Sequence, residues 1–82
     1  MNDLEKYYKV FVEIFDLQEK DVNDDLEYNS IPAWDSVGHM GMIAELEDVF
    51  GIMLEMDEII DFSSVGKGKE ILSKHGVEIW TI

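Results

Sequence analysis

Residues 36–50 carry the most regular helical pattern in this chain, and both ends of that pattern are marked. Pro32 has no amide hydrogen and disfavours helical angles in the residue before it, so a helix can begin only after this point. Asp35 and Ser36 both have side chains that accept hydrogen bonds from the amides of a first helical turn, and Gly51 suits a left-handed closing residue. Apolar residues recur between them at helical spacing: Val37, Met40, Ile43, Ala44, Leu46 and Phe50. The pattern predicts a helix that begins at Asp35 or Ser36 and ends before Gly51.

A second amphipathic helix is expected near the N-terminus. Asn2 or Asp3 can cap it, and Glu5 stands in the position that reaches back to such a cap. Its apolar residues form one stripe: Leu4, Tyr7, Tyr8, Phe11, Ile14 and Phe15. We interpret this aromatic stripe as core and assign it no ligand role.

The segment from Asp16 to Asp35 has no helical period and is predicted to be a long loop. Asp21, Asn23 and Asp25 match the first three ligand positions of a calcium-binding EF-hand loop. The position that needs glycine holds leucine, and the position of the bidentate carboxylate holds proline. We therefore expect no specific metal site in this loop.

The C-terminal third predicts two more helices. A short helix is expected over residues 57–62, and a final helix should begin after the serine pair 63–64 and end at Gly76. Residues 77–82 alternate apolar and polar side chains, yet a lone strand has no obvious partner. Trp80 is expected either to fold back onto the helices or to stay mobile.

These elements predict an all-α fold, a small bundle of three main helices and one short helix with a long loop between the first two. With 82 residues and no cysteine, the chain is expected to be one domain spanning residues 1–82. Its core is assigned to about residues 3–75, and residues 76–82 are assigned to a C-terminal tail.

The charge of the chain restricts its partners. Nineteen acidic residues against six lysines give a formal net charge of −13, which repels nucleic acid and anionic membrane surfaces. Lys20 and Lys67 bound a segment without any basic residue except histidine, and Ser36 lies inside it. We expect partner proteins that present basic docking patches. We expect neither nucleic-acid binding nor membrane insertion, and we expect the protein to be a monomer.

The N-terminus is acidic, unlike a signal peptide, and no stretch approaches the roughly 20 apolar residues of a membrane span, so we expect a cytoplasmic location.

The tripeptide Asp35-Ser36-Val37 and the run Leu-Glu-Asp-Val-Phe-Gly-Ile at 46–52 resemble the acyl carrier protein family. In that family an Asp-Ser-Leu-like tripeptide opens the second helix, and a Leu-Glu-x-x-Phe-x-Ile-like run closes it. The resemblance extends from Leu4 to about Leu72 and includes the long acidic loop.

The resemblance implies that Ser36 is the attachment point of 4′-phosphopantetheine, whose thiol carries acyl groups as thioesters to partner enzymes. A phosphate at the start of a helix is physically favoured, because the free amides and the helix dipole attract anions. By resemblance, Asp35 has its role in recognition by the phosphopantetheinyl transferase. His39, one helical turn after Ser36, could contact the attached phosphate.

The expected partner surface lies along the helix that follows Ser36. Gly41, Met42, Glu45 and Asp48 are the residues assigned to it, because Gly38 and Gly41 leave a low surface there and methionine adapts to different partners. Tight contact between these glycines and a neighbouring helix is the alternative. Fatty-acid carriers typically place an acidic residue where Gly41 stands. The resemblance therefore leaves open whether the carrier serves the biosynthesis of fatty acids, of polyketides or of other products.

Three other functions are compatible with parts of this sequence. An aminoacyl or peptidyl carrier of a specialised biosynthetic pathway would use the same serine, whereas an acidic helical interaction module would need no cofactor. A calcium sensor would require a large calcium-induced change in helix packing. We do not expect an enzyme, because Asp35, Ser36 and His39 lie within one helical turn and cannot adopt the geometry of a catalytic triad.

Overall fold

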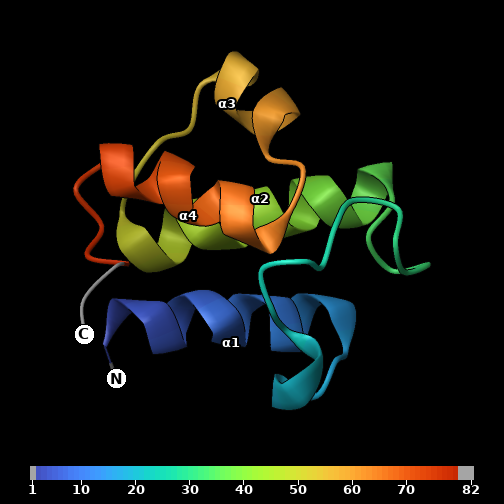
Figure 1. Cartoon of the computed structure of the whole chain (residues 1–82). Coiled ribbons are helices and arrows are strands. Elements are labelled where there is room, and N and C mark those ends of the chain that lie inside the picture. The colour runs from blue at the N-terminus through green and yellow to red at the C-terminus, as the bar shows by residue number, and fades with distance from the viewer. Residues whose placement is uncertain (1, 80–82) are drawn as a thin grey trace.

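The computed structural model describes residues 2–79. Within them the chain forms α1 (Asp3–Phe15), the 3₁₀-helix η1 (Glu19–Asp21), α2 (Ser36–Phe50), α3 (Met56–Asp61) and α4 (Val65–Lys74). In Figure 1, α4 lies in front of α2, α1 runs below them in the opposite direction, and the short α3 lies above. The prediction of an all-α bundle with three main helices, one short helix and a long first loop is confirmed.

Local sequence signals set the ends of the helices. Asn2 Oδ1 accepts a hydrogen bond from Glu5 N (2.9 Å) and caps α1, and Ser64 Oγ accepts one from Lys67 N (3.0 Å) and caps α4. Gly51 closes α2 in the left-handed conformation, with φ of 62°. These caps offset part of the cost of leaving terminal amides and carbonyls without helical partners.

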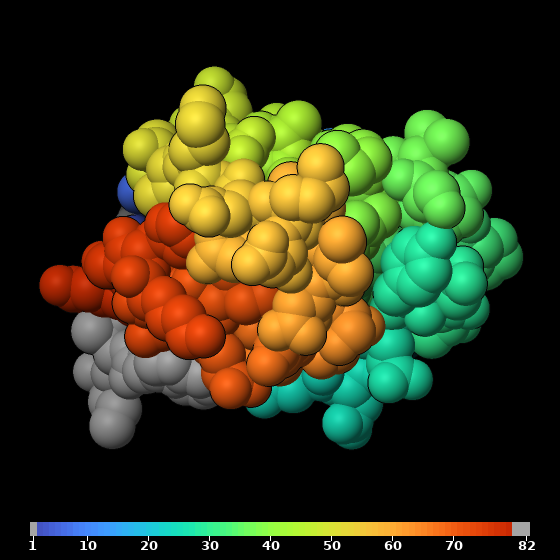
Figure 2. Space-filling view, turned by 90° about the horizontal axis from the view of Figure 1, so that it is seen from above, coloured from blue at the N-terminus to red at the C-terminus, as the bar shows by residue number. Residues whose placement is uncertain are grey.

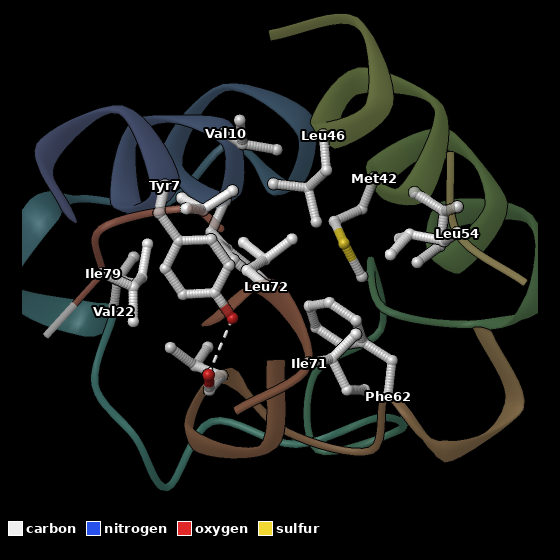
Figure 3. Close-up of a cluster of buried hydrophobic side chains, with 14 of the residues drawn as sticks. Tyr7, Val10, Val22, Met42, Leu46, Leu54, Phe62, Ile71, Leu72 and Ile79 are labelled. Atoms are coloured by element: carbon white, nitrogen blue, oxygen red, sulfur yellow. Dashed lines mark hydrogen bonds between the residues drawn. The ribbon is translucent and has the colours of Figure 1, made fainter. Parts of the chain in front are cut away.

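The core lies between the three main helices and is rich in aromatic side chains. Figure 3 shows part of it, including the hydrogen bond of 2.7 Å that the buried Tyr7 hydroxyl donates to Val65 O. Trp34, from the long loop, is fully buried and stacks on Phe15 with ring centroids 5.2 Å apart. On α1, Val10 is buried whereas Ile14 is 38% exposed, so the core face is shifted slightly from the predicted stripe.

The segment after α4 contributes to this core. Val77 and Ile79, which the sequence assigned to a tail, are 8% and 1% exposed. Glu78 N donates a hydrogen bond to Asp3 Oδ2 (3.0 Å), which joins this segment to the start of α1. The prediction for Trp80 lies outside the described residues.

The long loop is fastened to the start of α4. Glu27 and Ser64 form an antiparallel bridge, in which Tyr28 N donates to Ser63 O and Val65 N donates to Leu26 O, each at 2.9 Å. The loop therefore has a fixed path past the end of α3 and the beginning of α4.

Lys69 makes a second connection between this loop and α4. Its ammonium group lies 2.7 Å from Asp24 Oδ1 and 5.1 Å from the ring centroid of Tyr8. Burial alone would lower the pKa of Lys69, but the hydrogen bonds to Asp24 and Tyr8 outweigh burial and raise that pKa above its ordinary value of 10.5. The side chain thus stays charged where loop and helix meet.

None of the helices within residues 2–79 has the length and apolar character needed to cross a membrane.

Candidate functional site

Ser36 is the first residue of α2, and the cap of that helix is its neighbour. Asp35 Oδ1 accepts a hydrogen bond from Gly38 N (2.8 Å), which is the capping interaction expected of either residue. Both side chains are exposed. Because Asp35 caps the helix, the Ser36 hydroxyl is not needed for that purpose and remains accessible at the helix start.

The approach to Ser36 is a tight turn anchored by Trp34. Trp34 N donates to Ile31 O (3.1 Å), and Asn29, in the left-handed conformation with φ of 67°, donates its N–H to Trp34 O (2.9 Å). Gly38 faces this turn, and a Cβ added there would lie closer than 3.0 Å to Ala33 O. The absence of a side chain at Gly38 therefore permits the loop to pass against α2.

His39 links this turn to α3. The Trp34 indole donates to His39 Nδ1 (2.9 Å), and since an indole can only donate, Nδ1 accepts. Nε2, 2.8 Å from Ile59 O, must then carry the hydrogen and donate it to that carbonyl. The ring is thus in its neutral form with both nitrogens engaged. A contact between His39 and a phosphate on Ser36, as the sequence suggested, would require one of these bonds to be exchanged.

A second histidine holds the other side of α3. His75 Nε2, at the end of α4, lies 2.9 Å from Glu58 Oε1. A hydrogen bond from Glu55 N, and then the contact with His75, lower the pKa of Glu58 below its ordinary value of 4.5. The short α3 is therefore fastened to both long helices beside it.

Tyr28 contacts Ser36 directly. The Tyr28 hydroxyl and Ser36 Oγ share a hydrogen bond of 2.9 Å, and the rings of Tyr28 and His39 make a T-shaped contact with centroids 5.5 Å apart. Sequence reasoning missed this residue, because Tyr28 lies eight positions before Ser36 in a loop without period. No local signal could have placed it here.

An apolar groove opens beside Ser36, between the start of α2 and α3. Its volume is about 340 Å³. Most of the lining consists of apolar and aromatic side chains, those of His39, Met40, Met56, Ile59, Ile60 and Phe62. Three residues with hydroxyl groups complete it: Tyr28, Ser36 and Ser63. Figure 2 shows α3 lying next to the start of α2 and the loop around residue 28. A flexible chain attached to Ser36 would begin at the edge of this groove.

A larger groove, of about 490 Å³, follows the outer face of α1. Charged side chains dominate its lining, among them Glu5, Lys9, Glu13 and Glu19. None of the candidate site residues lines it.

The expected partner surface needs one correction. Met42 is fully buried, so its side chain cannot contact a partner in this structure, whereas Met40 is 53% exposed. Met42 lies one turn before Leu46, and both project into the core with Ile43. Gly41 and Asp48 are exposed, Glu45 is half-buried, and no side chain or backbone atom lies within 4 Å of a Cβ added at Gly41.

The surface around the groove combines exposed apolar residues with acidic ones. Val37, Met56 and Ile60 are 82%, 70% and 75% exposed. Asp35, Asp57 and Asp61 are exposed near them in sequence, and Lys67 pairs with Asp61 at 3.3 Å. Such a surface suits a partner that presents basic groups around an apolar centre.

In the part of the chain that the structure describes, no three metal-ligating side chains converge. In the loop that partly matches an EF-hand, Asn23 Oδ1 accepts a hydrogen bond from Asp25 N (2.9 Å) and Asp21 Oδ2 accepts one from Gln18 N (3.3 Å). These oxygens therefore already stabilise the local turns.

Comparison of the chain with protein-family models, with curated proteins and with solved structures finds no match.

Proposed function

We propose that this protein is an acyl carrier protein, in which Ser36 holds a 4′-phosphopantetheine arm and the arm carries acyl groups as thioesters between partner enzymes. The observation that carries the proposal is the position of Ser36: an exposed hydroxyl at the first residue of a long helix, capped independently by Asp35, at the edge of an apolar groove. The resemblance of Asp35-Ser36-Val37 and of residues 46–52 to carrier proteins supports the same assignment.

The attachment chemistry requires little from the protein itself. A phosphopantetheinyl transferase would join Ser36 Oγ to the phosphorus of coenzyme A that bears the pantetheine and break the pyrophosphate bond, with release of adenosine 3′,5′-bisphosphate and a proton. The product phosphodiester would lie near the free amides of the α2 start, where an anion is stabilised. Because the chain contains no cysteine, the thiol of the arm would supply the thioester chemistry.

The test is incubation with coenzyme A and several transferases of broad specificity, followed by intact-protein mass spectrometry. We expect one added phosphopantetheine group, and fragment ions that place it on Ser36. Ser36→Ala should stay folded, since Asp35 retains the cap, and should accept no group.

Asp35 can be tested without loss of the helix cap. Asn caps helices about as well as Asp, so Asp35→Asn should keep the stability of the wild type while it removes the carboxylate. We expect slower modification of this variant, in line with a role of Asp35 in transferase recognition. Modification at the wild-type rate would remove Asp35 from the proposed site.

The exposed apolar residues Val37, Met56 and Ile60 would also suit the alternative, an acidic interaction module without cofactor. The same experiment separates the two functions. If every transferase leaves the folded protein unmodified, the carrier assignment is wrong and the interaction module replaces it. Loading of the modified protein by an adenylating enzyme, instead of an acyltransferase, would indicate an aminoacyl carrier.

A further inference from the structure

Hydrogen bonds of the long loop hold Tyr28 beside Ser36, although eight positions separate the two residues. The Tyr28 backbone N–H donates to Ser63 O (2.9 Å), and the next residue, Asn29, donates to Trp34 O (2.9 Å). One bond fixes Tyr28 to the start of α4, and the other fixes it to the turn before α2. The backbone of Tyr28 is therefore constrained on both sides.

The Tyr28 side chain, which is 37% exposed, has contacts of its own. Its ring makes a T-shaped contact with His39, and that imidazole is itself held by Trp34 and by the Ile59 carbonyl. The hydroxyl ends 2.9 Å from Ser36 Oγ. These two contacts restrict the phenol, so its hydrogen bond needs less ordering when a new acceptor arrives.

We propose that Tyr28 is a positioning residue for the cofactor arm, and this inference rests on the proposed function. In the unmodified protein its hydroxyl shares a hydrogen bond with Ser36. After attachment it donates a hydrogen bond to the phosphodiester, whose oxygens take the place of the serine hydroxyl as its partner. A charged acceptor makes the bond stronger than the one it replaces.

The consequence is a preferred direction for the arm. Tyr28, Ser36, Met40 and Ile60 line the same groove, so a phosphodiester held by Tyr28 directs the following carbon chain along apolar side chains. The first carbons of the pantetheine arm carry two methyl groups, which suit an apolar lining. Tyr28 thus favours an arm that rests in the groove over one that extends into solvent.

Tyr28→Phe tests the inference, because it keeps the ring and removes the hydroxyl. The measurement is NMR on the modified protein with an isotope-labelled arm, with nuclear Overhauser contacts read between the arm methyls and the side-chain methyls of Met40 and Ile60. We expect clear contacts in the wild type and weaker ones in the variant, with a fall of about tenfold in the ratio of docked to extended arm, the shift that one hydrogen bond to a charged acceptor supports. The phosphorus resonance should also move. Tyr8→Phe, which removes a phenol at the Lys69 contact, should change neither signal.

A second measurement needs no substitution. The resonance of the Tyr28 carbon that bears the hydroxyl should move when the wild type is modified, because the hydrogen-bond partner of that hydroxyl changes from a neutral hydroxyl to an anion. An unmoved resonance, an arm without contacts to the groove, or equal contacts in the wild type and Tyr28→Phe would each overturn the inference. These outcomes all presuppose a modified protein, so they differ from failure of the proposed function, which mass spectrometry reports as an absent modification.

Discussion

Gly68 lies in α4 where the core leaves no space for a methyl group, so Gly68→Ala is a sharp test of the packing. A Cβ added at Gly68 would come closer than 3.0 Å to the Tyr7 hydroxyl oxygen and to Phe62 Cζ. Both rings are buried, and the Tyr7 hydroxyl is hydrogen-bonded to Val65 O at 2.7 Å. Neither ring can move without disturbing its own contacts (Figure 3).

Three terms decide the effect of this substitution on the free energy of unfolding. Replacement of glycine by alanine inside a helix normally stabilises by about 1 kcal/mol. Overpacking of a filled core destabilises by about 1–3 kcal/mol, and loss of the Tyr7 hydrogen bond by about 1 kcal/mol. The overpacking and the lost bond outweigh the helical gain, so we expect Gly68→Ala to be less stable by about 2 kcal/mol. For a domain of this size that lowers the melting temperature by about 10 °C.

Gly41→Ala is the matched control, because Gly41 is also a helical glycine but nothing lies within 4 Å of its added Cβ. Gly41→Ala should be more stable than the wild type by about 1 kcal/mol, the gain from replacing glycine by alanine inside a helix, and its melting temperature should be about 5 °C higher. Urea denaturation followed by circular dichroism measures both variants. If Gly68→Ala proved as stable as the wild type, the close contact between α4, Tyr7 and Phe62 would be refuted.

Three further predictions concern charge. Added salt should raise the melting temperature, since it screens the repulsion of a chain with net charge −13; maximal stability at the lowest ionic strength would contradict this. The folded protein holds the pKa of Glu58 below 4.5, so this carboxylate stabilises the fold above pH 4.5, and the stabilisation is lost as the pH falls through the folded pKa. Glu58→Gln should therefore be less stable than the wild type in neutral solution. Melting curves over a pH series should show that this difference in stability shrinks in acid. Burial, and then the charge of Asp24, raise the pKa of Tyr7 well above 10.0. The free energy of unfolding should therefore fall as the pH rises beyond about 10. Ultraviolet titration should show that Tyr7 ionises only when the protein unfolds.

The helix boundaries could be predicted from the sequence because local chemistry sets them. Asp35, Ser64 and Asn2 satisfy amides of the helices that follow them, and Gly51 supplies the positive φ that ends α2. Each of these signals acts over a few residues, so it can be read without knowledge of the rest of the fold.

The arrangement around Ser36 could not be predicted in the same way. Apolar residues lie on several sides of α2, so its pattern could not decide that Met42 is buried while Met40 and Val37 are exposed. The contact between Tyr28 and Ser36 depends on hydrogen bonds between the long loop and the start of α4. Backbone N–H and C=O groups form these bonds, and every residue except proline carries both, so the sequence does not indicate which of them pair.

The hydrogen bond between Glu78 and Asp3 brings the two ends of the described segment together at the start of α1. Ser36 lies elsewhere, because Gly38, only two residues after it, faces Phe15 at the far end of α1. A guest domain whose ends meet can be spliced into a surface loop of a host protein without being stretched. The segment from Asp3 to Glu78 is therefore suited to insertion into a surface loop of another protein.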